Sequence, residues 1–154
     1  MKLRHLLPIL LSSVSLLGCS GKGDGATKEL KLIEIAEIGV TISAPADWKL
    51  TKSMDRYYGL AGPDGTQVQI IGSILSGGDS LDELAKECRE TVLEKEMLPG
   101  GAYYVLCKGK QAGRDTKAVK VNVSTGEKSS VRCQWETDAD PAMIATVCKT
   151  LKKI

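Results

Sequence analysis

The sequence predicts an α+β domain, in which an antiparallel sheet is packed by two main helices. Several short segments alternate apolar with polar residues or are continuously apolar, as strands do. The segment 80–98 and the C-terminal segment from residue 140 instead repeat apolar residues every three or four positions, as amphipathic helices do. The resulting order is strands, helix, three strands, helix, which favours helices packed on an antiparallel sheet.

The first part of the domain is predicted to be strands. Segments 30–35 and 39–44 open it, and the turn APADW at 44–48 follows. Segments 57–61 and 68–75 flank GPDGT, whose Pro, Asp and Gly favour a tight turn. These last two segments therefore predict a hairpin.

The segment Ser80–Leu98 predicts the first helix. Ser80 and Glu83 match the S-x-x-E capping box, and PGG at 99–101 ends the helix. One apolar stripe would face the sheet, formed by Leu81, Leu84, Ala85, Cys88 and Val92.

Three strands are expected at 102–108, 117–124 and 130–136. A final helix follows, with Asp140 as its N-cap and Pro141 at its first position. Its buried stripe would consist of Ile144, Val147, Cys148 and Leu151, and its last turn would carry Lys149, Lys152 and Lys153, where the helix dipole favours cations.

This order of elements over about residues 30–152 resembles the fold of PsbP-type proteins of the photosystem lumen and of several bacterial exported lipoproteins. The P-x-x-W turn at Pro45 and Trp48 adds to the resemblance. It implies a PsbP-like sandwich. Because members of that group are mostly non-catalytic binding or assembly factors, it also implies such a role here.

The N-terminus has the layout of an export signal. Lys2 and Arg4 precede an apolar stretch that is too short to span a bilayer as a mature helix. The stretch ends in LLGC at Leu16–Cys19, which resembles the lipobox of bacterial lipoproteins. The resemblance implies that residues 1–18 are cleaved and that Cys19 is acylated. A plain signal peptide with an incidental cysteine is the alternative.

The predicted organisation is a signal peptide at 1–18, a flexible tether at 19–28 and a single α+β domain at 29–154. Acyl chains on Cys19 would hold the tether on membrane lipid. Lipoprotein sorting in many Gram-negative bacteria retains proteins with Asp after the cysteine. Ser20 stands there, so the resemblance implies the outer membrane, or the outer leaflet of the plasma membrane in a one-membrane cell.

Composition excludes several classes of function. The chain has 21 Lys and Arg residues, and Lys2 and Arg4 leave with the signal, so 19 cations would balance 19 carboxylates in the mature protein. That balance offers no footprint for nucleic acid. The single histidine, His5, also leaves, so we expect no His-based triad or metal site, and no cofactor motif is present.

Four cysteines remain in the exported domain, and their even number indicates two disulfides. Cys133 and Cys148 each lie roughly 10 Å from the intervening turn, at ~3.3 Å per strand residue and ~1.5 Å per helix residue. Cys88 and Cys107 match less closely, at roughly 14 and 18 Å by the same rises. We predict Cys133–Cys148 and Cys88–Cys107. The alternative is Cys107–Cys133 with Cys88–Cys148.

Other candidate sites have simpler interpretations. Asp138 and Asp140 form a D-x-D that fits a helix start better than a metal site. GLAGPDG at 59–65 is a turn and not a phosphate loop, and the glycosylation sequence at Asn122 falls inside a strand. Five aromatic residues could line a ligand groove, but we favour packing for most of them: Trp48, Tyr57, Tyr58, Tyr103 and Tyr104.

Together these features predict a lipid-anchored extracytoplasmic lipoprotein that acts as a non-catalytic binding or assembly module at the cell envelope. Its partner would be an envelope protein or a small ligand of unknown identity. The alternatives are a periplasmic enzyme inhibitor and a hydrolase that depends on carboxylates or a Ser–Lys pair.

The anchor can be tested by Cys19→Ser, with Ser20→Ala as the control. Without the acylated sulfur, the protein should leave the membrane or keep its signal peptide, whereas Ser20→Ala should behave as wild type. Detergent partitioning and the mass of the N-terminal peptide measure this. Unchanged partitioning of Cys19→Ser together with a cleaved signal peptide would contradict acylation at Cys19.

Overall fold

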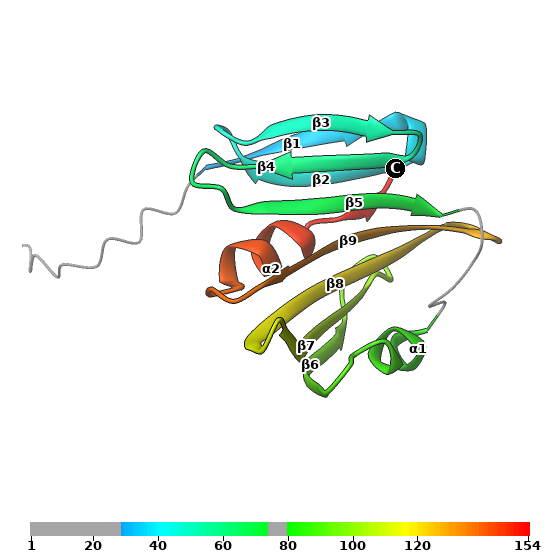
Figure 1. The fold of residues 1–154 in the computed structure, drawn as a ribbon. Coiled ribbons are helices and arrows are strands. Elements are labelled where there is room, and N and C mark those ends of the chain that lie inside the picture. The colour runs from blue at the N-terminus through cyan, green and yellow to red at the C-terminus, as the bar shows by residue number, and fades with distance from the viewer. Residues whose placement is uncertain (1–28, 74–79) are drawn as a thin grey trace, which may run out of the picture.

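The computed structural model describes residues 29–73 and 80–154, which form two antiparallel sheets and two short α-helices (Figure 1). The smaller sheet has the strand order β1-β2-β10, from Leu30–Ile35, Val40–Pro45 and Lys152–Lys153. A 3₁₀ turn at Ala36–Ile38 joins β1 to β2, and Gly39 after it takes a φ of 71°, which glycine adopts without strain.

The larger sheet has seven strands in the order β3-β4-β5-β9-β8-β7-β6. Their bounds are Lys49–Met54 (β3), Tyr57–Ala61 (β4), Gln67–Ser73 (β5), Thr91–Met97 (β6), Tyr103–Gln111 (β7), Arg114–Gly126 (β8) and Ser129–Thr137 (β9). Every neighbouring pair is antiparallel. The helices are α1 at Leu81–Lys86 and α2 at Ala142–Cys148.

One face of the larger sheet is buried against the smaller sheet and α2. Ile70, Cys133 and Val121 are aligned across three neighbouring strands, and all three are fully buried. Ile42 of β2 packs in the same cluster, together with Val147 of α2. Side chains alternate between the two faces of a strand. The residues next to Ile70, Cys133 and Val121 in their strands therefore point to the opposite face of the sheet, which we call the outer face.

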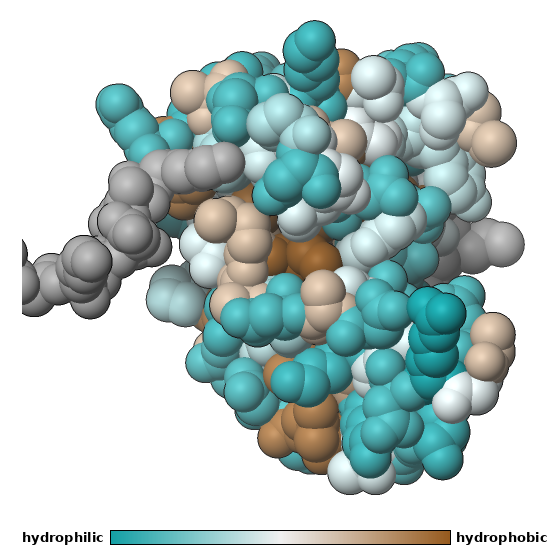
Figure 2. All heavy atoms as spheres, turned by 60° about the vertical axis from the view of Figure 1, so that its left-hand side comes forward, coloured by the Kyte–Doolittle hydropathy of each residue, from teal (hydrophilic) through white to brown (hydrophobic). Residues whose placement is uncertain are grey.

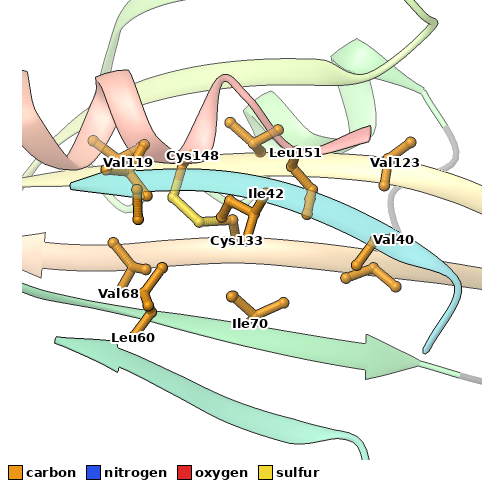
Figure 3. Packing of buried hydrophobic residues seen from close by; sticks show 14 of the residues in the cluster. Val40, Ile42, Leu60, Val68, Ile70, Val119, Val123, Cys133, Cys148 and Leu151 are labelled. Carbon is orange, nitrogen blue, oxygen red and sulfur yellow. A yellow bond between two sulfur atoms is a disulfide. The ribbon is translucent and has the colours of Figure 1, made fainter. Parts of the chain in front are cut away.

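The Cys133–Cys148 disulfide lies inside this core and joins β9 to α2. Figure 3 shows its sulfur atoms among aliphatic side chains that include Ile42 and Val119. Both cysteines are fully buried. The closed loop has a sequence separation of 15, for which the chain-entropy account gives about 3 kcal/mol of stabilisation.

The second disulfide, Cys88–Cys107, fastens the chain after α1 to β7. It belongs to a small apolar cluster on the outer face, where Leu84 of α1 packs against Val105. Both disulfides are the pairs that the sequence argument favours, and the alternative pairing of Cys107 with Cys133 is not formed.

The expected α+β class with two main packing helices is wrong, because the chain is predominantly β. The helix predicted over Ser80–Leu98 ends at Lys86, and 91–97 is strand β6. Its N-cap is confirmed, since Ser80 Oγ accepts a hydrogen bond from the Glu83 amide at 3.2 Å. The sequence PGG at 99–101 closes the β6–β7 hairpin, and Leu98 N donates to Ala102 O at 2.7 Å across it.

Two further boundaries differ from the prediction. The C-terminal helix ends at Cys148, and Lys152 and Lys153 form β10 beside β2. Strand β3 was not predicted; it is a mostly exposed edge strand with a bulge between Lys52 and Met54, so it lacks an alternating apolar pattern.

The tight approach of the 3₁₀ turn to β5 can be tested with two strand glycines. A Cβ at Gly72 would lie 2.8 Å from Cγ2 of the buried Ile38, whereas a Cβ at Gly109 would meet Thr116 Oγ1 at an ordinary 3.4 Å. Gly72→Ala should therefore lower the free energy of unfolding by about 1–3 kcal/mol. Gly109→Ala should change it by less than about 0.5 kcal/mol. Urea unfolding measures both, and equal effects would contradict the described packing.

Candidate binding groove

The candidate site is a groove on the outer face of the larger sheet, over β5, β9 and β8. Gln69, Gln134 and Lys120 form one row of aligned residues across these strands. Ile71, Arg132 and Asn122 form the next row. Both rows alternate with the buried rows, so they point away from the core. The groove floor therefore carries mostly polar side chains, with Ile71 among them, whereas the reverse side of the same strands is apolar.

Two cavities lie along this floor. The larger has a volume of about 390 Å³ and extends toward Lys108, Gln111 and Glu136. The smaller, of about 320 Å³, extends toward Asn122, Ser130 and Arg132. Glu87 and Gln134 line both cavities.

Glu87 stands between the two cavities and binds two cations. It is the C-cap residue of α1, and its carboxylate accepts two hydrogen bonds from the Arg132 guanidinium, both at 2.8 Å. Lys120 Nζ donates to the same carboxylate at 3.0 Å and to the Glu87 carbonyl oxygen at 3.2 Å. A bidentate Arg–carboxylate pair is among the stronger polar contacts in proteins. We call these three residues the Glu87 bridge.

The bridge is partly shielded from solvent. The side chains of Lys120 and Arg132 are 16% and 22% exposed, and that of Glu87 is 34% exposed. Burial alone would raise the pKa of the Glu87 carboxyl, but hydrogen bonds from Lys120 and Arg132 and their positive charges outweigh it and lower the pKa below its usual value. The Glu87 carboxylate is therefore stable as the anion.

The described residues that line the groove, taken together with the bridge, carry a small excess of positive charge. The charged residues that line the two cavities are Glu87, Glu136, Arg89, Lys108, Lys120 and Arg132. Glu136 accepts a hydrogen bond from Thr116 at 2.6 Å. Among the described residues, the Lys108 ammonium lies 3.8 Å from the carboxylate of Asp115, which lines neither cavity, so three cations accompany the two carboxylates of the groove. Glu87 is the carboxylate that holds two of those cations at once.

The Cys88–Cys107 disulfide borders the larger cavity. It fixes the residue that follows Glu87 to β7, and so keeps the bridge carboxylate over the sheet. The Cys133–Cys148 disulfide lies in the core, on the other face, and does not contribute to the groove. Cys88–Cys107 is therefore part of the candidate site, whereas Cys133–Cys148 belongs to the core.

The five aromatic candidates do not form a ligand groove. Trp48, Tyr58 and Tyr104 are buried in the main core, as their packing interpretation implies. Tyr103 packs on the small outer cluster, and Tyr57 is 42% exposed on β4. None of the five lines either cavity.

The remaining sequence candidates have structural partners. At the start of α2, Asp140 Oδ1 accepts a hydrogen bond of 3.1 Å from the Ala142 amide. Asp138 Oδ2 lies 3.5 Å from Nη1 of Arg114. Within residues 29–73 and 80–154, no cluster of three or more His, Cys, Asp or Glu side chains could hold a metal. The 59–65 segment is strand and turn, and Asn122 is buried in β8.

Cys19, the proposed acylation site, lies outside the described residues, as do the signal peptide and tether. In the part of the chain that is described, no helix has the length and hydropathy of a membrane span. Large apolar side chains are exposed on several separate elements, such as Leu32 on β1, Met54 on β3 and Met97 on β6. Figure 2 accordingly shows a mostly hydrophilic face, with hydrophobic atoms in a central recess.

Sequence reasoning missed Glu87, Arg132 and the groove. The signal for its floor was present, because Arg132, Gln134 and Glu136 alternate with the apolar positions of β9, and Lys120 does the same in β8. No signal identified Glu87, because the predicted helix placed it within a long regular segment.

Comparison with known proteins shows the fold. No family model and no curated protein matches the sequence. The cyanobacterial PsbP protein CyanoP from Synechocystis sp. PCC 6803 matches with a TM-score of 0.51 at 13% identity, covering 90% of this chain and 99% of that one. The predicted PsbP-like fold is therefore supported, as a β-rich domain rather than one packed by two main helices.

Two further solved structures are similar. LpqN, described as involved in cell envelope biogenesis of Mycobacterium tuberculosis, matches with a TM-score of 0.50 at 13% identity over 80% of this chain and 90% of that one. A protein from Bacteroides thetaiotaomicron matches with a TM-score of 0.53 at 14% identity over 75% of this chain. This chain covers only 45% of the Bacteroides protein. At such identities the likeness concerns the fold alone.

The Glu87 bridge predicts a pH-dependent contribution to stability. Because the folded pKa of Glu87 is lowered, the stabilisation is present above the unfolded pKa of about 4.5 and is lost as pH falls through the folded value. At pH 7, Glu87→Gln should lower the free energy of unfolding by roughly 1 kcal/mol, reduced by solvent screening. The difference from wild type should shrink below about pH 4. Urea unfolding at pH 7 and pH 3 measures it, and a constant difference would contradict the bridge.

Proposed function

We propose that the protein is a lipid-anchored extracytoplasmic module, without catalytic activity, that binds a ligand or partner at the cell envelope through the outer-face groove. The observation that carries the proposal is the groove itself. The larger sheet leaves a polar face with two cavities of about 390 and 320 Å³. The other face of the larger sheet is buried in the core.

The fold supports the class of function. CyanoP is a cyanobacterial PsbP, and LpqN is described as involved in cell envelope biogenesis. Both have the fold that this chain adopts. An envelope role is also what the lipobox resemblance at Leu16–Cys19 implies.

The lipid anchor would determine how far from the membrane the groove lies. Acylated Cys19 would attach the protein to membrane lipid, and Ser20 favours the outer membrane, with the domain facing the periplasm. The tether at 19–28 has ten positions, and a fully extended chain spans at most ~3.5 Å for each, so the domain would stay within about 35 Å of the bilayer. The expected ligand is therefore one present near the membrane surface.

One observation favours the alternative of a carboxylate-dependent hydrolase, because Glu87 and Glu136 line the same cavity. A general acid, however, needs a raised pKa near the working pH. The pKa of Glu87 is lowered, because its hydrogen bonds to Lys120 and Arg132 outweigh the effect of burial. The groove chemistry therefore favours binding over acid–base catalysis.

Site-specific photo-crosslinking in cells tests the groove as a binding surface. A photoreactive residue is placed at Gln69, which is exposed on the groove floor, or at Thr146, which is exposed on α2. With the anchored protein at its native level, Gln69 should give a discrete adduct and Thr146 should not. Gels and mass spectrometry identify the adduct. Equal adducts at both positions, or none at Gln69, would contradict the proposed binding face.

A further inference from the structure

We propose that the groove binds its ligand through a carboxylate or phosphate group, and that the Glu87 carboxylate occupies the position of this group until the ligand displaces it. The inference rests on the proposed function, because it names the chemistry of the ligand for the same groove. In the structure described above, the Glu87 side chain acts as an internal competitor.

Lys120 and Arg132 form a two-cation site on neighbouring strands. Lys120 is aligned with Gln134, and Arg132 with Asn122, so the two cations lie in adjacent rows of the same face. Both converge on one carboxylate, within 3.0 Å for Lys120 and 2.8 Å for Arg132. The planar guanidinium matches the two oxygens of a carboxylate or phosphate, and the ammonium adds a point charge. This geometry is suited to an anionic group.

Glu87 lies in the segment that connects α1 to β6, and not on a strand of the sheet. It follows the six-residue helix α1 and precedes an irregular stretch before Thr91, where β6 begins. The neighbouring Cys88 is fixed to Cys107, so the main chain stays in place. Rotation of the Glu87 side chain alone would withdraw the carboxylate, whereas Lys120 and Arg132 would remain on the sheet.

Withdrawal of Glu87 would also change the shape of the site. Glu87 and Gln134 are the residues that line both cavities, and the bridge crosses the groove between them. Without it the cavities would join along β9. From Ser130 to Glu136 that path is about 20 Å long, at ~3.3 Å per strand residue. A ligand with an acidic group and an extended remainder would fit this path.

Charge in the groove favours the same ligand. Arg89 lines the larger cavity in addition to Lys120, whereas the Lys108 ammonium at its border lies 3.8 Å from Asp115. Among the described residues, Arg89, Lys120 and Arg132 accompany the carboxylates of Glu87 and Glu136 along the two cavities, so withdrawal of Glu87 increases the positive charge of the groove. An incoming anion would therefore replace one carboxylate with another and would not leave a buried charge unpaired.

The test measures binding of citrate and of inorganic phosphate to the full-length protein in non-ionic detergent, by calorimetry at an ionic strength of about 0.15 M, where charges farther apart than about 8 Å are screened. Glu87→Gln removes the competitor, so its affinity for at least one of the two probes should exceed that of wild type by about tenfold or more, because a site that is rarely open binds weakly in proportion to its open fraction. The probe that gains identifies the group as carboxylate or phosphate.

Glu136→Gln is the matched control. It removes one carboxylate from the same cavity but leaves the Glu87 bridge intact, so it should raise the affinity by less than about threefold, the size of a general electrostatic effect in screened solution. Equal gains in Glu87→Gln and Glu136→Gln would overturn the displacement by showing that only net charge matters. No gain in Glu87→Gln would overturn it as well.

Lys120→Met in the Glu87→Gln background should abolish the gain in affinity for the probe. Lys108→Met in that background should keep most of the gain.

If Glu87→Gln fails to fold, as far-ultraviolet circular dichroism would show, Glu87→Asp replaces it. The shorter carboxylate of Asp reaches the two cations poorly and should also raise the affinity for the probe. A gain that survives Lys120→Met overturns the inference. A discrete adduct at Gln69 without any gain in anion binding would reject this inference and leave the proposed function standing.

Discussion

The main core covers one face of the larger sheet, whereas on the other face α1 covers mainly the part formed by β6 and β7, and this asymmetry determines most of the molecule. On the core side, the aligned row of Ile70, Cys133 and Val121 excludes water together with β2 and α2. Burial of apolar area there supplies the main driving force for folding. Since strand side chains alternate, a shift of one residue in β8 or β9 would bring Lys120 or Arg132 to the core face. The register is fixed by the core, and the arrangement of the groove follows from that register.

The Glu87 bridge is the second consequence of this asymmetry. Lys120 and Arg132 point outward because Val121 and Cys133 point inward. Two cations on adjacent strands would repel each other, and α1 places a carboxylate over them. The partial exposure of all three side chains matters, because a bridge that water can reach is worth less than a buried one and is easier to exchange. The same contact thus stabilises the fold and remains open to competition.

Local patterns in the sequence predicted the strands with clear alternation, the Ser80 cap and the tight turns, because those features depend on neighbouring residues alone. The segment 91–97 falls inside the predicted helix because the apolar stripe continues to Val92 and the first stop signal is PGG at 99–101. Pairing with β7 and the Cys88–Cys107 disulfide override that pattern. Strand β10 was not predicted for a similar reason. Lys152 and Lys153 have no strand pattern of their own and form a strand by pairing with Thr41 and Val40 of β2.

The candidate site was less predictable than the fold, because it joins residues that are distant in sequence. Glu87 lies 45 positions from Arg132 and 33 from Lys120. No local pattern links a helix-terminal glutamate to cations on two later strands. The outward positions of β8 and β9 could be read from their alternation, but the carboxylate above them depends on where α1 crosses the sheet.

The β6 edge of the larger sheet is poorly suited to pair with a second copy of the chain. All seven residues of β6 are exposed, but a two-fold pairing of two copies centred on Lys95 would place Lys95 opposite itself and Glu94 opposite Glu96. Like charges directly opposite are destabilising. Glu94 already accepts from Tyr104 at 3.2 Å, and Glu96 from Lys149 at 2.5 Å. Charges and a bulge after Val92 thus protect the β6 edge from pairing with another copy. The opposite edge, β3, likewise carries exposed Lys49 and Lys52 and a bulge between Lys52 and Met54. The groove over β5, β9 and β8 is instead a surface whose shape and charge favour a ligand.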